Sequence, residues 1–175
     1  VYHGWCETNA HYCNEKLIGA YNLLYLVDPE MDDENPEDDH GHGSHTASTA
    51  AGNFVEASFI LGETPLVRDI SGVAPHANIV AYKVCIPNDT GGAGCSDPSS
   101  VAAVELAIDT DDVDVINFSI GPGLYPWTDP VELAFLDATA AGIFVSESAG
   151  NNGPGLNTVG HESTWNSVLA ASTHS

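Results

Sequence analysis

Basic residues are almost absent from this chain. Of its 175 residues, only Lys16, Arg68 and Lys83 are lysine or arginine, against 25 aspartates and glutamates, and the formal net charge at pH 7 is −22. An electrostatic field of that sign repels phosphate backbones and anionic lipid. We therefore expect neither a nucleic acid nor a membrane surface among the partners of this protein.

Long apolar runs are also missing. No run of about 18 apolar residues occurs, so we expect no membrane-spanning helix. No basic start leads into an apolar stretch, so we expect no signal peptide within the chain. Because the sequence does not begin with Met, we expect a mature form or a piece of a longer protein. Its length suits one domain with a real core.

The four cysteines form no C-x-x-C motif, and no histidine lies at zinc-knuckle spacing from them. They fall into two local couples, Cys6 with Cys13 and Cys85 with Cys95, each beside turn-forming residues. This grouping favours two disulfides and an oxidising compartment. Four reduced thiols in a cytosolic protein are the alternative that the cysteine count leaves open.

Apolar runs alternate with helical patterns along most of the chain, which predicts an α/β fold. We expect strands over residues 17–27, 77–85, 113–120, 143–148 and 167–172, and helices over residues 45–53, 97–108 and 129–142. Near-continuous apolar strands alternating with helices predict three layers, a parallel sheet with helices on both faces.

Three of the helix ends carry recognisable signals. Asp97 and Asp129 are expected N-caps, each followed by a proline at the first helical position. Gly52 is expected to end the helix of small residues, whose alanines are spaced for close packing against another element.

Ligands of such sheets bind at the carboxyl ends of the strands. Two segments are expected there, GPGLYPW after Ile120 and AGNNGPG after Ser148, and the turn HGHGSH joins them if its helix packs on the same sheet. We expect any function to lie where these segments converge.

The turn HGHGSH has two interpretations, as a metal cradle or as the site of a catalytic base. His40, His42 and His45 occupy the histidine positions of the H-x-H-x-D-H motif of metallo-beta-lactamase-like hydrolases, with Ser44 in place of the aspartate. Imidazoles at this spacing suit zinc. However, an acidic loop precedes the motif instead of a buried strand. The histidines at 76, 161 and 174 lie in turn-like or terminal contexts and supply no convincing further ligands.

Four segments in order favour the second interpretation. They are HGSHTA around His42, GVAPHANIVAYKV (72–84), DVINFSIG (114–121) and SAGNNGP (148–154). Together they resemble the subtilisin-like serine proteases, and they are spread over residues 42–154. The resemblance implies a subtilisin-like fold, incomplete at both ends.

The plant-type, cucumisin-like branch and its bacterial relatives are the more similar part of that family. HGWCETNAHYCNEKLIGA, GHGSHTASTAAGN and YKVC resemble the corresponding segments of that branch, with a small difference in the spacing of the first tryptophan and cysteine. This resemblance also implies that both cysteine couples are disulfides.

The resemblance implies roles for particular residues. His42 is the candidate general base, and Asn151 the candidate side-chain donor to the oxyanion. Ser119, Ile120 and Gly121 match the strand that pairs with extended substrate. His45 is expected to be structural and His40 exposed.

Two parts of a catalytic triad are not found. No D-[ST]-G precedes His42, and Asp28 is rejected because Pro29 follows it and it lies too near His42. The G-T-S-M-A-x-P segment of the nucleophile is absent too. We therefore expect residues 1–175 to be the central part of one subtilase catalytic domain, inactive when isolated.

The acidic run 28–39 lacks the order of an EF-hand loop, and a solvated loop is favoured over a calcium site. The expected reaction requires no cofactor, although the resemblance allows a structural calcium. Polypeptide substrates and an extracellular location of the parent protein follow from the resemblance. A non-catalytic subtilase-like binding module and an H-x-H-x-x-H metallohydrolase are the alternatives.

Overall fold

The computed structural model describes residues 1–28, 35–109, 113–121 and 123–173. The chain divides into two compact units. The first unit comprises Val1–Asn22, Asp32–Lys83 and Pro87–Ala93, and the second comprises Leu23–Met31, Val84–Ile86 and Gly94–Ser175. Each unit contains a parallel sheet of its own.

The sheet of the first unit has three parallel strands in the order β1 (His3–Gly4), β2 (Leu17–Asn22) and β5 (Ile79–Lys83). The short helices α1 (Trp5–Thr8) and η1 (Ala10–Tyr12) connect β1 to β2. Tyr21 and Tyr82 are register partners on β2 and β5, and their rings stack with centroids 5.2 Å apart. The pairing of two segments about sixty residues apart is the parallel arrangement that the sequence predicts.

Helix α2 (His42–Ala51) begins three residues before the expected start and is followed by Gly52, as expected. The segment after β4 closes its C-terminal end, because Val73 and Ala74 donate backbone hydrogen bonds to the carbonyls of Thr49 and Ala50. These are among the carbonyls that a helix end leaves without intrahelical partners. A helix buried along its small residues was expected, and this is wrong for the described chain, in which α2 is mostly exposed and only Ala51 is buried.

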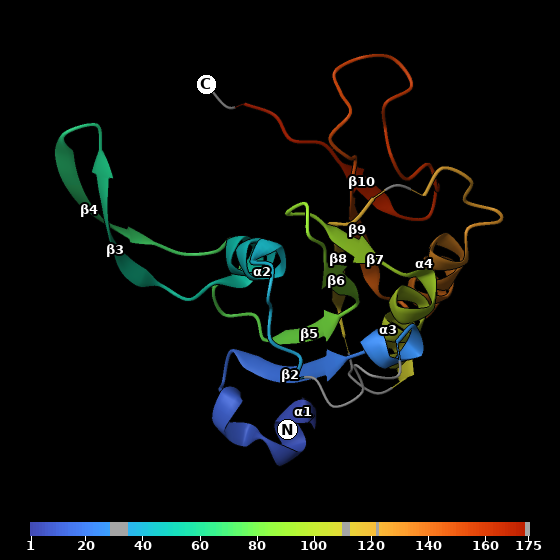
Figure 1. Ribbon diagram of the computed structural model, residues 1–175, viewed down its shortest axis with the longest axis horizontal. Coiled ribbons are helices and arrows are strands. Elements are labelled where there is room, and N and C mark those ends of the chain that lie inside the picture. Colours follow the sequence, from blue (N-terminus) through green and yellow to red (C-terminus); the bar gives the residue numbers. More distant parts are fainter. Residues whose placement is uncertain (29–34, 110–112, 122, 174–175) are drawn as a thin grey trace. The chain divides into compact units, whose positions relative to one another are not determined.

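An antiparallel hairpin in the first unit was not predicted. It consists of β3 (Val55–Leu61) and β4 (Thr64–Ile70) and extends away from the sheet of its unit (Figure 1). Leu61 pairs with Thr64, so the turn contains only Gly62 and Glu63, and Gly62 has φ of 64°. A two-residue loop that begins with glycine, between runs of residues typical of strands, predicts a hairpin, and this pattern is present in the sequence.

The second unit has the parallel sheet β10-β9-β8 and two long helices. Its elements are η2 (Leu24–Leu26), α3 (Asp97–Asp109), β8 (Val115–Phe118), α4 (Pro130–Ala140), β9 (Phe144–Ser148) and β10 (Ser167–Leu169). Val104 of α3, Phe135 of α4 and Val145 of β9 belong to one buried cluster. Both helices therefore pack against the same face of this sheet.

The helix starts in this unit follow the sequence signals in one case and not in the other. Asp129 caps α4 as predicted, because its Oδ1 accepts hydrogen bonds from the backbone N–H groups of Val131 and Glu132. Asp97 was predicted to cap α3 but lies within the helix. Ser96 takes that role, since its Oγ accepts the N–H of Ser99 at 3.3 Å. A serine directly before Asp-Pro competes for the same position.

The predicted α/β class with parallel strands is confirmed. The strands form two sheets of three rather than one continuous sheet. In the described part of the second unit, α3 and α4 cover one face of the sheet, and the opposite face exposes Val115 and Phe144. The described residues contain no helix long and apolar enough to cross a membrane.

Both predicted cysteine pairs are disulfides in the structure. Cys6 is bonded to Cys13, and Cys85 is bonded to Cys95. The second bond closes the ribbon of β6 (Cys85–Pro87) and β7 (Ala93–Cys95). The alternative of four reduced thiols is therefore not the one that the structure shows.

Candidate functional site

His42 is the first residue of α2 in the first unit and is exposed to solvent. Gly41 precedes it with φ of 96°, a backbone conformation that glycine adopts without strain. The neighbouring ring of His40 lies with its centroid 6.3 Å from that of His42. His40 is exposed as expected, and its Nε2 lies 3.2 Å from the carbonyl oxygen of Gly91.

Asp38 holds the turn that leads into His42. Its Oδ1 accepts the backbone N–H groups of His40 at 3.0 Å and Gly41 at 2.8 Å, and its Oδ2 accepts that of Ser44 at 2.7 Å. Burial opposes ionisation of this carboxyl, but the hydrogen bonds from Gly41, Ser44 and His40 outweigh it and hold the pKa of Asp38 below its usual value. The base candidate therefore follows a turn fixed by one carboxylate.

The three histidines of the turn do not assemble a metal cradle. Among the described residues, the one group of three ligand-type side chains whose ligand atoms lie within 4.8 Å of one another is Glu132, Glu147 and His161. That group lies in the second unit, far along the sequence from His42. The H-x-H-x-x-H interpretation gains no support from this geometry.

The acidic run 28–39 lies partly outside the described residues, which exclude 29–34. The two acidic side chains at its end have protein partners. Asp38 accepts the backbone bonds given above, and Asp39 forms an ion pair with Lys83 at 3.0 Å. These contacts occupy both carboxylates within the first unit.

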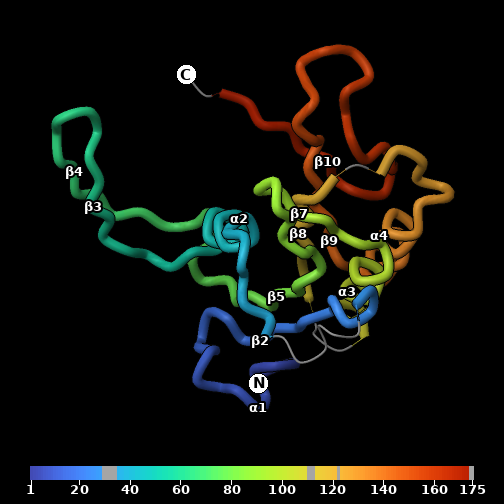
Figure 2. Tube along the Cα trace, in the orientation of Figure 1, coloured from blue at the N-terminus to red at the C-terminus, as the bar shows by residue number. Residues whose placement is uncertain are grey.

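Asn151 lies in the second unit, in the long loop between β9 and β10 that Figure 2 draws in orange. Its side chain is exposed. The loop is anchored beside it, because the Ala149 N–H donates to Leu169 and the Gly160 N–H donates to Ala149. Gly150 has φ of 83°, so the turn before Asn151 uses the glycine that the sequence supplies.

Ser119, Ile120 and Gly121 follow β8 directly, in the same unit as Asn151. The Ile120 carbonyl accepts a hydrogen bond from His161 Nε2 at 2.7 Å and a longer one from Ser148 Oγ at 3.5 Å. Ser119 Oγ accepts the side-chain N–H of Asn117 at 3.1 Å. The end of β9, which leads to Asn151, therefore contacts the predicted substrate segment.

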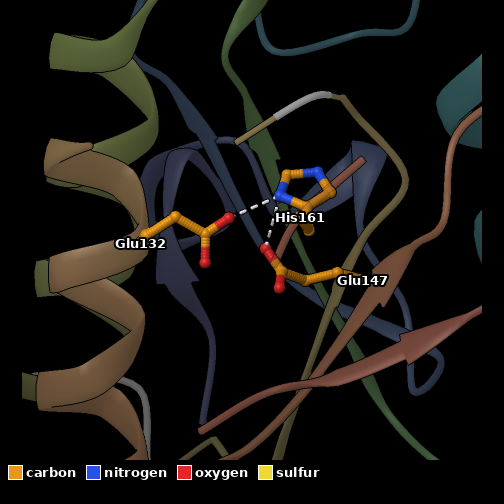
Figure 3. Close-up of side chains that lie close together, drawn as sticks. All are labelled: Glu132, Glu147 and His161. Carbon is orange, nitrogen blue, oxygen red and sulfur yellow. Dashed lines mark hydrogen bonds and ion pairs between the residues drawn. The ribbon is translucent and has the colours of Figure 1, made fainter. Parts of the chain in front are cut away.

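His161 is buried, although it lies in the turn-like context that the sequence indicates. Its side chain is 3 % exposed, and its Nδ1 faces Glu132 Oε1 at 2.5 Å and Glu147 Oε1 at 3.0 Å (Figure 3). Burial alone would lower the pKa of His161, but the hydrogen bonds from its ring to Glu132, Glu147 and Ile120 raise it to about 10. His161 is therefore an imidazolium at neutral pH.

Asn166 completes this buried cluster. Its Nδ2 donates to Glu147 Oε2 at 2.8 Å and lies 3.3 Å from Glu132 Oε2, with Ser163 Oγ at 3.0 Å. Asn166 Oδ1 is buried without a hydrogen-bond partner among the described residues, and the contact given for Glu147 Oε1 is the one with His161 Nδ1 at 3.0 Å. We use the name Glu-His-Glu cluster for Glu132, Glu147 and His161.

The sequence signal for the cluster was an acid inside each of two apolar stretches. Glu132 lies in VELAF and Glu147 in IFVSES, and both are at most 2 % exposed. Glutamates are almost never fully buried unless paired, so a buried cation was to be expected near each. His161 was overlooked because the motif V-G-H-E looks like an ordinary turn, and its φ of 38° fits one.

The predicted residues thus fall into two groups. His42 belongs to the first unit, and Asn151, Ser119, Ile120 and Gly121 belong to the second. Within the second unit the structure brings the predicted substrate segment together with the start of the Asn151 loop. The roles of all five residues remain predictions.

Comparison with known proteins gives the family. Residues 6–175 match the subtilase family. The chain is 40% identical to subtilisin-like protease SBT5.4 of Arabidopsis thaliana over 92% of this chain and 21% of that protein. It is 38% identical to SBT1.6 and 35% identical to SBT1.7 of the same plant, each over 97% of this chain and 23% of the relative.

These relatives agree with the plant-type resemblance of the cysteine and histidine segments. The chain spans about a fifth to a quarter of the length of the curated relatives it matches. With nearly the whole chain matched, the protein belongs to the subtilase family.

Proposed function

We propose that this chain is the central part of a secreted serine endopeptidase that cleaves polypeptides through an acyl-enzyme. His42 is the general base that takes the proton of the nucleophile and returns it to the leaving amine. Asn151 donates its side-chain amide to the oxyanion. The match of residues 6–175 to the subtilase family is the observation that carries this proposal.

The local geometry is compatible with these roles. His42 is exposed at the start of a helix whose preceding turn Asp38 fixes, so its ring is accessible to a reacting group. Asn151 is exposed beside a glycine with positive φ, in a loop anchored to β10. In subtilisin, removing the corresponding donor costs about 3 kcal/mol of transition-state stabilisation.

The aspartate and the serine of the triad are proposed to lie outside residues 1–175. The isolated chain is then inactive, because loss of the nucleophile costs roughly a million-fold in the rate of subtilisin. The chemistry needs no cofactor. Any calcium in the parent protein would be structural, and its removal with EDTA is expected to lower the Tm before it lowers kcat.

The test is fluorophosphonate labelling read by intact mass, on the isolated 175-residue chain and on the full-length parent protein. The isolated chain is expected to give no adduct. The full-length protein is expected to give a single adduct, whose formation slows at least a hundredfold on His42→Ala substitution. Absence of labelling in the full-length protein would contradict the proposal and favour a non-catalytic binding module.

A further inference from the structure

The Glu-His-Glu cluster contacts the predicted substrate segment, because His161 Nε2 lies 2.7 Å from the Ile120 carbonyl oxygen. Its three side chains come from α4, from β9 and from the loop between β9 and β10 (Figure 3). Each is at most 3 % exposed, so a substrate does not touch them. Any influence on the reaction must therefore act through a neighbouring group.

Hydrogen-bond chemistry fixes the state of the His161 ring. Nε2 lies 2.7 Å from the Ile120 carbonyl, which can only accept, so Nε2 carries a hydrogen. Nδ1 faces carboxylate oxygens of Glu132 and Glu147, at 2.5 and 3.0 Å, so a hydrogen on Nδ1 has an acceptor there. Both ring nitrogens thus have an acceptor, and this arrangement favours the imidazolium form of His161.

The cluster connects this imidazolium to rigid elements on either side. Glu132 is positioned by the first turn of α4, whose start Asp129 caps, and Glu147 by pairing of β9 with β8 and β10. Asn166 donates to the outer oxygen of both carboxylates, at 3.3 Å for Glu132 and 2.8 Å for Glu147. The imidazolium thus has little freedom to move relative to the sheet.

Gly123, three residues beyond Ile120, also packs against a member of the cluster. A Cβ atom added to Gly123 would lie 2.9 Å from Cδ of Glu132, so only glycine fits there. The Glu162 N–H approaches the Gly123 carbonyl at 3.4 Å. Residues of the cluster and the adjacent Glu162 therefore fix the positions of both Ile120 and Gly123.

We propose that His161 is a positioning residue for substrate binding: its imidazolium, held between Glu132 and Glu147, fixes the Ile120 carbonyl and with it the segment Ser119–Gly121. This inference rests on the proposed function, which makes that segment the strand that pairs with an extended peptide. The Ile120 carbonyl is occupied by His161 and Ser148. Pairing with the substrate backbone therefore falls to Ser119 and Gly121.

The experiment compares His161→Gln with His76→Gln in the full-length protein. Glutamine can still donate to Ile120, but it carries no charge and cannot bridge both carboxylates. His76 is exposed in the first unit, so the same substitution there is the matched control. The readouts are KM and kcat for a peptide that spans several subsites, the rate of fluorophosphonate labelling, and Tm.

His161→Gln is expected to raise the peptide KM about tenfold, the equivalent of one lost charge-assisted hydrogen bond. The rate of labelling by the small fluorophosphonate is expected to change less than about twofold, because that probe does not require backbone pairing. His76→Gln is expected to change neither. Glu147→Gln keeps the shape of the site and is expected to raise KM in the same direction by less, since Glu132 still holds the ring.

Four outcomes would overturn the inference. An unchanged peptide KM in His161→Gln is one, and an equal loss of peptide cleavage and labelling with a fall in Tm would show a merely structural role. If His161→Gln does not fold, an unchanged KM in Glu147→Gln decides against the inference. Stoichiometric divalent metal in the purified wild type, lost on His161→Gln, would mean that an ion and not a proton joins the carboxylates. Failure of wild-type labelling would instead contradict the proposed function.

Discussion

The two histidine sites of this chain differ in exposure and in whether their residues are close together in the sequence. His42 and the carboxylate that fixes its turn, Asp38, lie within five consecutive residues and are exposed. His161 is buried between Glu132 and Glu147, which lie 29 and 14 positions away in the sequence. A motif read along the chain can reveal the first kind of site, whereas the second kind exists only after three elements have packed together.

Replacing the histidine of each site by leucine should show the difference between the two sites most clearly. His161→Leu leaves two buried carboxylates without a cation and is expected to lower the free energy of unfolding by about 3–5 kcal/mol. His42→Leu, at an exposed position, is expected to change it by less than about 0.5 kcal/mol. Urea unfolding followed by tryptophan fluorescence measures both. Equal effects would mean that burial does not distinguish the two sites.

The charge can also be removed by pH instead of mutation. The pKa of His161 is raised from 6.5 to about 10, so the folded state binds the proton more tightly than the unfolded state. The stability that this proton supplies is fully present below pH 6.5 and is lost as the pH rises through 10. The effect should be smaller than that of His161→Leu, because a neutral ring keeps one N–H donor.

The measurement is the free energy of unfolding of the wild type and of His161→Gln between pH 6 and 10.5. The variant should lack the part of the decline that the wild type shows across this range. Parallel curves for the two proteins would show that other groups cause the decline.

The sequence predicted the elements better than their assembly. The proline and aspartate signals located α4, and the two cysteine couples are the disulfides of the structure. By contrast, the hairpin β3–β4 was missed although Gly62 and Glu63 mark its turn. Local chemistry determines caps and turns, and these can be read within a few residues.

The buried cluster could not be read in the same way. Glu132 and Glu147 are unusual in apolar stretches, which indicates that they need a partner but not which one. Seven other histidines were available, and only the packing of the β9–β10 loop selects His161. The pairing of distant segments depends on tertiary contacts that no spacing rule contains.

Gly121 of the predicted substrate segment and Gly123 beyond it provide a finer test of which positions the cluster supports. Gly123→Ala would bring a methyl group against the Glu132 side chain and is expected to cost about 1–3 kcal/mol of stability. At Gly121 the nearest atom to an added Cβ is His161 Nε2 at 4.0 Å, so Gly121→Ala should be nearly neutral for folding. The proposed function adds that Gly121→Ala raises the peptide KM while Tm stays constant.

Thermal unfolding and peptide kinetics of the two variants distinguish these effects. A large loss of stability in Gly121→Ala would show that its surroundings are tighter than the structure has them. An unaltered Tm in Gly123→Ala would mean that Glu132 moves freely, and the cluster would then not be rigid.

The smallest effects on stability are expected near His42, where Asp38 and Asp39 stabilise the fold through different interactions. Asp38→Ala removes the acceptor of three backbone N–H groups and is expected to cost about 1 kcal/mol, the usual value of a helix cap. Asp39→Ala removes an ion pair to Lys83 whose carboxylate side is 49 % exposed, and should cost at most about 0.5 kcal/mol. Because the pKa of Asp38 is lowered in the folded state, its contribution is present above pH 3.8 and is lost as the pH falls below that value.

Raising the salt concentration should weaken the Asp39 pair and leave the Asp38 turn almost unchanged, since hydrogen bonds to adjacent backbone are screened far less than an exposed ion pair. Chemical unfolding at two salt concentrations measures the difference, and equal salt sensitivity of the two variants would show that Asp38 acts through its charge and not through the turn that it fixes.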